Sequence, residues 1–475
     1  MPDGSRPSPA SPPRAADVAP AIAATVEAQR EFFAAGSTLP QHAREEVLRA
    51  FLSAVEKHED RIIEALHEDM GRSSTEAYLS EVGYVTGEIR GAIKSLSRWM
   101  RPKKMFSPLA AAPSRSMLVS QPLGLTLIVS PWNYPVQLAL APLVGAVAAG
   151  NVCVVKPSEL APASSAVVKS ILDMAFDPKW VATIEGGVET SQALLNHRWD
   201  HIFFTGGTEV GRIYAKAGAE HLSRVTLELG GKSPTIVTES ADLDVTAKRI
   251  AWGKWFNVGQ TCIAPDYVLA HSSIREALVQ KIGAALTAFY GDDPQQSADY
   301  GRIINDRHFA RIAGLIDADK VAIGGRTDAA DRYIAPTVMT DVTLEDAIMG
   351  EEIFGPVLPV LDYTSMDEVL ATIAQRPNPL ALYLFTTNPV DEKLILDRVS
   401  FGGGCINNTL MHFSDHKLPF GGVGSSGLGA YHGQHSFDVF SHQKGVLKTA
   451  NFLDPSVKYP PYDDGKRRIL RKLVH

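Results

Sequence analysis

The sequence predicts an α/β protein built around a doubly wound parallel sheet, because short apolar runs alternate with helical segments in its central part. Such alternation requires parallel crossovers, and ligands of these sheets bind beyond the carboxyl ends of the strands. The expected strands are Leu125–Val129, Val152–Val155, Val181–Ile184, Ile202–Phe204 and Val225–Leu227, and the expected helices lie near Val136–Ala149, Ala163–Phe176 and Glu209–Ala217.

The segment before this sheet is predicted to be helical. Apolar residues recur there at three- and four-residue steps between Val47 and Leu66. A second helical run extends from about Glu76 to Met100, where Pro102 prevents its continuation. Residues 1–17 are rich in Pro, Ser and Ala and lack the apolar core of a signal peptide, so we expect a disordered tail.

Composition limits the class of protein. Hydrophobic residues make up 45% and charged residues 21% of the 475, an ordinary globular balance. The net charge of −7 argues against nucleic-acid binding. The three cysteines are far apart in sequence, which favours a reducing, cytoplasmic location. The uncharged stretch from Ser116 to Val155 contains too many Pro and Gly residues for a membrane span, so we expect buried strand, helix and strand instead.

Two glycine-containing segments are candidates for a phosphate-binding loop. The run Ile202–Gly211 passes from an apolar strand through Gly206 and Gly207 into a helix that contains Gly211. Free N–H groups at a helix start attract phosphate, although a plain tight turn has the same pattern. The G-x-G-x-x-G of Gly422, Gly424 and Gly427 follows no apolar strand and opens no helix, so we reject it as the phosphate loop.

Two charged residues follow the second strand. Lys156 and Glu159 could hydrogen-bond a ribose, because an acidic group after a strand commonly reads the 2′-hydroxyl of NAD. The alternative is a solvated loop with two ordinary charges. His412, Asp415 and His416 have a spacing found in metal sites, but no further ligand group accompanies them, so we expect no metal.

Cys262 and Glu228 are the candidates for chemistry. Cys262 follows Gly259, Gln260 and Thr261, and a nucleophilic cysteine needs a partly open, polar setting that favours the thiolate. The alternative is a buried structural cysteine, which suits Cys153 and Cys405. Glu228 ends an apolar strand, where burial raises a carboxyl pKa and allows general-base catalysis. Its alternative role is a salt bridge with Lys232.

Taken together, these segments resemble the aldehyde dehydrogenase superfamily over nearly the whole chain, and class 3 and coniferyl aldehyde dehydrogenases most closely. Seven motifs occur in the order typical of that family. They are PWNYP (Pro131–Pro135), KPSE (Lys156–Glu159), FTGGTEVG (Phe204–Gly211), LELGGKSP (Leu227–Pro234), GQTC (Gly259–Cys262), EEIFGP (Glu351–Pro356) and LPFGGVGSSGLG (Leu418–Gly429). Val258 departs from the family pattern, in which a smaller residue is expected.

The resemblance implies a role for each motif residue. Cys262 is the implied nucleophile and Glu228 the base, while the Asn133 side chain and the Cys262 N–H form the oxyanion hole. NAD is the implied cofactor, and class 3 members often accept NADP as well. Lys156 and Glu159 would hold its adenosine ribose, and Glu352 and Phe354 its nicotinamide ribose and ring. The aldehyde would form a thiohemiacetal and then a thioester on the cysteine, which activated water hydrolyses.

The resemblance also implies the architecture and assembly. Residues 18–101 and 121–229 would form a Rossmann-type NAD(P)-binding domain, and residues 230–430 an α/β catalytic domain. Residues 102–120 and 431–475 would form a small β oligomerisation flap and a C-terminal extension of a homodimer. No membrane or nucleic-acid partner is implied.

Two other functions remain open. The first is a dehydrogenase that passes its acyl group to coenzyme A, which would not need Glu228 as a base. The second is a non-catalytic binding protein on the same fold, against which the intact set of Asn133, Glu228 and Cys262 argues. The substrate is not named by the sequence, although Tyr134, Trp252 and Phe413 could line an apolar pocket suited to aromatic or medium-chain aliphatic aldehydes.

Overall fold

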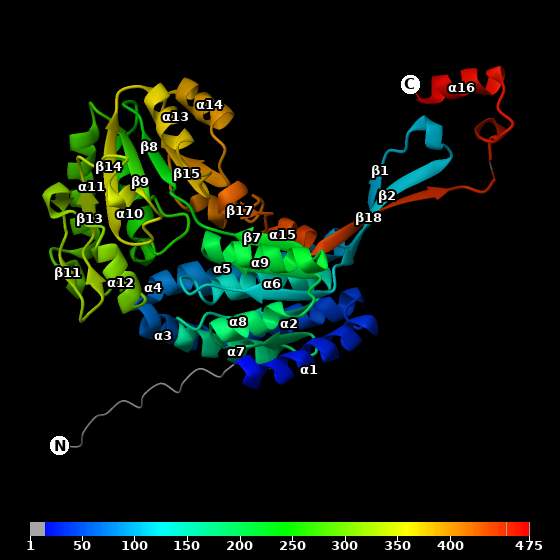
Figure 1. Ribbon diagram of the computed structural model, residues 1–475, viewed down its shortest axis with the longest axis horizontal. Coiled ribbons are helices and arrows are strands. Elements are labelled where there is room, and N and C mark those ends of the chain that lie inside the picture. The colour runs from blue at the N-terminus through cyan, green and yellow to red at the C-terminus, as the bar shows by residue number, and fades with distance from the viewer. Residues whose placement is uncertain (1–14, 453, 475) are drawn as a thin grey trace.

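A computed structural model describes residues 15–452 and 454–474 and arranges them around three main β-sheets (Figure 1). The first sheet has the strand order β17-β7-β6-β3-β4-β5, in which all neighbours are parallel except β17, which pairs antiparallel to β7. Its strands are β3 (Leu125–Val129), β4 (Val152–Lys156), β5 (Val181–Thr183), β6 (His201–Thr205), β7 (Arg224–Glu228) and β17 (Gly427–Leu428). The five predicted strands are thus confirmed, each within one residue at either end.

The helices between these strands are α6 (Gln137–Ala149), α7 (Pro162–Ala175), α8 (Val188–Leu195) and α9 (Thr208–His221). The predicted ranges of α6 and α7 are confirmed within one residue, α9 continues four residues beyond its predicted end, and α8 was not predicted. Every residue of α6 is buried, which explains the long uncharged run in the sequence. The segment from Ser116 to Val155 therefore forms part of one strand, then a strand, a helix and a further strand. No helix among the described residues is long and apolar enough to cross a membrane.

The N-terminal helices pack against this first layer, with α2 and α3 on α7 and α5 on α6. Their bounds are α1 (Ala15–Ala34), α2 (Gln41–Lys57), α3 (Glu59–Met70), α4 (Ser74–Ala77) and α5 (Gly83–Trp99), with a π-helical turn, η1, at Tyr78–Val82. The predicted disordered tail of residues 1–17 needs correction at its end, because α1 begins at Ala15. Residues 1–14 lie outside the described part of the chain.

The second sheet has seven strands in the order β10-β13-β14-β9-β8-β15-β16, parallel except for β10. Figure 1 places it at the upper left, above the first layer. Its strands are β8 (Pro234–Val237), β9 (Tyr267–His271), β10 (Val321–Ile323), β13 (Thr337–Met339), β14 (Val357–Tyr363), β15 (Ala381–Phe385) and β16 (Gly403–Ile406). Its helices are α10 (Leu243–Trp255), α11 (Arg275–Tyr290), α12 (Asp306–Ala313), α13 (Met366–Ala374) and α14 (Pro389–Arg398), and a two-stranded ribbon joins β11 (Thr327–Asp328) to β12 (Tyr333–Ile334).

The third sheet is antiparallel and extends away from the rest of the molecule at the right of Figure 1. It consists of β1 (Lys103–Met105), β2 (Ser114–Pro122) and β18 (Ser441–Thr449). The short helix α15 (Gly433–Val439) precedes β18 and packs against α6. The basic end of the sequence forms helix α16 (Asp464–Val474).

Candidate active site

Cys262 lies after a strained turn between α10 and β9. Three consecutive residues of this turn have left-handed backbone angles, with φ of 52° at Asn257, 55° at Val258 and 72° at Gly259. A β-branched residue such as Val258 rarely adopts this conformation, which costs about 1–3 kcal/mol and is typical of functional sites. Gly259 could carry no side chain, because its Cβ would lie 2.3 Å from the carbonyl oxygen of Gly355.

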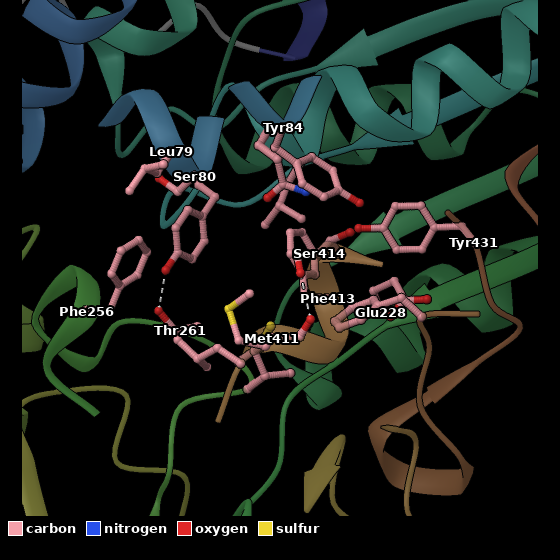
Figure 2. A pocket seen from close by; sticks show the side chains of 18 of the residues that line it. Leu79, Ser80, Tyr84, Glu228, Phe256, Thr261, Met411, Phe413, Ser414 and Tyr431 are labelled. Carbon is pink, nitrogen blue, oxygen red and sulfur yellow. Dashed lines mark hydrogen bonds between the residues drawn. The ribbon is translucent and has the colours of Figure 1, made fainter. Parts of the chain in front are cut away.

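Cys262 and Glu228 line the same pocket. Glu228, labelled in Figure 2, ends a strand of the first sheet, whereas Cys262 lies in a loop before a strand of the second. The cavity has a volume of about 290 Å³ and is lined mostly by apolar side chains. Tyr134 and Trp252, the two residues predicted for the substrate pocket, both contribute to the lining, as does Phe413. Other lining residues, several labelled in Figure 2, are Leu79, Tyr84, Phe256, Met411, Phe420 and Tyr431.

Glu228 is the last residue of β7 and is 3% exposed. Neither of its carboxylate oxygens has a hydrogen-bond partner among the described residues. Burial raises the pKa of this carboxyl well above its ordinary value. The salt bridge considered as its alternative role is not formed, because the Lys232 ammonium lies 2.5 Å from the Asp266 carboxylate instead. The structure therefore leaves Glu228 free to accept a proton in the pocket.

The surroundings of Cys262 differ from our expectation of a polar setting that favours the thiolate. Burial, followed by the negative charges of Glu352 and Glu228, raises the pKa of the Cys262 thiol. The polar side chains of the two preceding residues are hydrogen-bonded to other partners. The Gln260 side chain bonds the backbone at Ile304 and Arg302, and the Thr261 hydroxyl lies 2.6 Å from that of Tyr134.

Asn133 is buried behind the pocket and is not part of its lining. Its side-chain nitrogen donates a hydrogen bond of 3.0 Å to the carbonyl of Gln260, two residues before Cys262. An amide nitrogen carries two hydrogens, so one remains for a second acceptor. The structure thus joins the PWNYP segment to the cysteine-bearing loop through Asn133.

The residues expected at the adenosine ribose lie together at the end of β4. The Lys156 ammonium is 2.9 Å from the Glu159 carboxylate. The Lys156 side chain is buried, whereas that of Glu159 is 40% exposed and accessible to a ligand. An acidic side chain at the carboxyl end of a strand in this kind of sheet is correctly placed for a ribose hydroxyl.

The three glycines after β6 differ in their surroundings. A Cβ at Gly207 would meet nothing within 4 Å, so this glycine borders open space at the start of α9. No side chain caps α9 there, which leaves its first N–H groups for an anion. Gly206 and Gly211 instead permit close packing, because a Cβ at either would lie 2.6 Å from the side chain of Phe204 or Leu229, respectively.

Hydrogen bonds to neighbouring backbone carbonyls hold the segment that contains Glu352 and Phe354. Lys232 donates to the Glu351 carbonyl at 2.9 Å, and Arg311 donates to the Ile353 carbonyl at 2.6 Å. Phe354 has a left-handed φ of 50° and packs edge-on against Trp132. Burial raises the pKa of Glu352 to about 8. With Gly207 and Glu159, this arrangement fits a dinucleotide, because it offers an open helix start and carboxylates for two ribose rings.

The structure also reveals a buried polar network that sequence reasoning missed. Arg72, Glu81 and Asn257 are all at most 3% exposed and connect the PWNYP segment to the cysteine-bearing loop. In the sequence, Arg72 and Glu81 occur among many charged residues of the helical N-terminal third. Their sequence context therefore indicates solvent-exposed side chains. The one signal in the sequence was Val258, next to Asn257, where a residue larger than the family pattern expects turned out to have a left-handed backbone.

The histidines with metal-like spacing have other partners. His416 forms an ion pair with Glu88, and the Nδ1 of His412 lies 3.5 Å from the sulfur of Cys405. Within residues 15–452 and 454–474, no three His, Cys, Asp or Glu side chains are grouped to hold a metal ion.

Comparison with known proteins identifies the family of this chain. Residues 10–446 match the sequence profile of the aldehyde dehydrogenase family. The chain is 45% identical to 4,4'-diaponeurosporen-aldehyde dehydrogenase of Staphylococcus aureus over 444 residues, which cover 93% of this chain and 96% of that one. It is 44% identical to the dimeric NADP-preferring aldehyde dehydrogenase of Canis lupus familiaris, with coverage of 93% and 98%.

Solved structures show the same fold. The substrate-bound structure of Staphylococcus aureus AldH superposes with a TM-score of 0.94 at 43% identity, covering 96% of this chain and 99% of that one.

Aldehyde dehydrogenase family 3 member H1 of Arabidopsis thaliana is a further relative, 44% identical over 94% of this chain and 93% of its own. The resemblance to class 3 members is therefore confirmed. The chain belongs to the aldehyde dehydrogenase family and is an NAD(P)-dependent oxidoreductase that acts on aldehydes.

Proposed function

We propose that the enzyme oxidises an apolar aldehyde to the carboxylic acid, with Cys262 as the nucleophile and Glu228 as the base for hydrolysis. The observation that carries this proposal is the buried Glu228 carboxylate, which has no hydrogen-bond partner among the described residues and lines one apolar cavity with Cys262. Burial of a carboxylate without a hydrogen-bond partner costs free energy. General-base catalysis is the role that suits a carboxyl group with a raised pKa.

In the first step the Cys262 sulfur forms a bond to the aldehyde carbon, while the carbonyl oxygen becomes an alkoxide. The thiol proton passes to solvent, to which the half-buried Cys262 is partly exposed. The Asn133 amide and the Cys262 peptide N–H stabilise the alkoxide, because fixed donors in a dry site act strongly on developing charge. NAD(P), when bound, would supply the hydride acceptor; as hydride leaves the aldehyde carbon, the alkoxide re-forms a carbonyl and yields the thioester.

In the second step the acyl group is held on Cys262 as a thioester. Glu228 removes a proton from water, the resulting hydroxide attacks the acyl carbon, and the Cys262 sulfur departs with the electron pair of the broken bond. A base at this point needs a pKa near neutrality, and burial moves that of Glu228 upward from its ordinary value.

The cavity supports an aromatic or medium-chain aliphatic aldehyde as substrate. Its lining is apolar apart from a few hydroxyl and amide groups and Glu228. The Staphylococcus aureus relative is named for its aldehyde substrate, 4,4'-diaponeurosporen-aldehyde. The ring centres of Trp252 and Phe256 lie 5.2 Å apart, and Trp252 is 36% exposed. Both rings would face the part of the substrate farthest from the aldehyde group.

The cofactor preference, domains and assembly are part of the same proposal. Glu159 favours NAD, because a 2′-phosphate would meet a like charge there. Residues 18–101 and 121–229 bind the cofactor, residues 230–430 contribute the cysteine, and residues 102–120 and 431–475 form the flap and extension. The canine relative is named dimeric, and we propose a cytoplasmic homodimer that associates through the flap.

One experiment separates this function from its alternatives. NADH formation from hexanal and benzaldehyde should proceed without coenzyme A and yield the free acid. A rate that depended on coenzyme A, with an acyl-coenzyme A product, would indicate acyl transfer in place of hydrolysis. Absence of NADH formation with every aldehyde, despite cofactor binding, would indicate a non-catalytic protein.

A further inference from the structure

Arg72 is a charged residue buried at 1% exposure, and the reaction steps described above do not use it. Its Nη1 lies 2.7 Å from the carboxylate of Glu81, which is also fully buried. Its Nη2 donates to the main-chain carbonyl of Asn133 and, at 2.8 Å, to the side-chain oxygen of Asn257. The guanidinium carbon lies 4.9 Å from the centre of the Tyr134 ring.

The acceptors of Arg72 belong to the two segments that carry the proposed oxyanion donors. Asn133 supplies one donor, and Asn257 lies on the left-handed turn that precedes Cys262. The Asn257 amide also donates to the Asn133 carbonyl at 2.9 Å and to the Gln260 carbonyl at 3.1 Å. One guanidinium nitrogen thus joins the two segments directly, and its planar geometry fixes the angle between its two acceptors.

Glu81 fixes the other side of this arrangement. Its second carboxylate oxygen accepts from the N–H groups of Val136 at 3.0 Å and Gln137 at 2.6 Å, at the start of α6. Glu81 lies in the π-helical turn, whose Leu79 and Ser80 line the pocket (Figure 2). π-helical turns occur mostly as local distortions at functional sites. The pair therefore fixes the helix that follows Asn133 as well as Asn133 itself.

We propose that the buried Arg72–Glu81 pair is a positioning element that holds the Asn133 amide in register with the Cys262 peptide N–H, so that both donors meet one substrate oxygen. A donor displaced by about 1 Å loses much of its effect on a developing charge. Arg72 contacts neither substrate nor cofactor in this assignment. The inference rests on the proposed roles of Asn133 and Cys262.

The first test variant is Arg72→Lys, which keeps the charge but cannot bond two acceptors in a fixed plane. We expect the rate of the first NADH burst to fall about 10- to 100-fold, less than the roughly 10²–10³-fold that removal of an oxyanion donor costs. The KM for aldehyde and the Kd for NAD should stay within about threefold, because the bonds to the oxygen strengthen only in the transition state. Iodoacetamide alkylation of Cys262, which forms no oxyanion, should also stay within about threefold.

Two further variants keep the test decisive if Arg72→Lys folds poorly. Arg72→Met combined with Glu81→Gln removes both charges together and leaves no carboxylate unpaired. Arg44→Lys is the matched control, because Arg44 is also buried and binds the backbone carbonyls of Thr38 and Ala148 away from the pocket. We expect the double variant to lose burst rate like Arg72→Lys, and the control to lose thermal stability without losing burst rate.

The results that would overturn the inference are distinct from those that would overturn the proposed function. A folded double variant with an unchanged burst rate, or with alkylation slowed as much as the burst, would show that Arg72 does not act through the oxyanion. Asn133→Ala is measured beside these variants. If it too kept the full burst rate, the oxyanion role of Asn133 itself would be wrong.

Discussion

The carboxylate of Glu228 and the thiol of Cys262 line one cavity, although Glu228 ends a strand of the first sheet and Cys262 lies in a loop before the second. Burial, then the charges of Glu352 and Glu228, raises the pKa of the thiol. Burial likewise raises the pKa of the Glu228 carboxyl, so their shared surroundings disfavour the charged form of both groups.

Cys262 is expected to be the only cysteine required for activity. Cys262→Ala should abolish NADH formation while the Kd for NAD changes little, since the cofactor residues lie on other elements. Cys405→Ala is the stringent control, because Cys405 is also half-buried and close to a histidine, His412. Cys153→Ala should likewise remain active. Inactivation by iodoacetamide that labels Cys405 alone would contradict the assignment.

The cofactor-free enzyme should show the raised pKa of the Cys262 thiol directly. Only the thiolate reacts with iodoacetamide, and its fraction grows about tenfold per pH unit below the pKa. In a Cys153→Ala/Cys405→Ala background, the alkylation rate should thus still be rising at about pH 9, where an ordinary cysteine of pKa about 8.5 approaches its plateau. A plateau reached below about pH 8 would show that the thiol pKa is not raised.

Glu228→Gln should separate the two steps of the reaction. Hydrolysis needs activated water, and a well-placed general base contributes roughly 10²–10⁴-fold to the rate. We expect a rapid NADH burst approaching one equivalent of active sites, followed by slow turnover, because the thioester accumulates. Mass spectrometry of the quenched protein should find the acyl group on the peptide that contains Cys262.

Two outcomes would contradict this division of steps. Turnover of Glu228→Gln at the wild-type rate would make Glu228 merely structural. Loss of burst and turnover together, in a folded variant that still binds NAD, would show that Glu228 is indispensable for activation of the thiol.

Glu159→Gln should narrow the preference for NAD over NADP. The substitution keeps a polar side chain beside Lys156 but removes the negative charge that would oppose a 2′-phosphate. The ratio of kcat/KM for the two coenzymes should therefore fall. Asp173→Asn, which removes one exposed negative charge on α7, is the control and should leave the ratio unchanged. An unchanged ratio of kcat/KM in Glu159→Gln would show that Glu159 does not determine the coenzyme preference.

The sequence by itself determined the succession along the chain of the five parallel strands of the cofactor sheet and of three helices between them. The strands Leu125–Val129 and Val152–Val155 could be found because local apolar runs of strand length and their flanking glycines are properties of contiguous residues. The same is true of the motifs around Cys262 and Glu228, whose order along the chain indicated the family. Pattern reasoning also placed Tyr134 and Trp252 at the pocket correctly.

Only the tertiary structure decided how these residues act on one another. It showed that the polar groups of Gln260 and Thr261, the sequence neighbours that suggested a polar site, are bonded to Arg302 and Tyr134. It also brought Arg72 and Glu81 to the base of the PWNYP segment, 61 residues from Arg72 to Asn133 along the chain. Burial and electrostatic coupling depend on distances in space between elements remote in sequence, and no local pattern contains those distances.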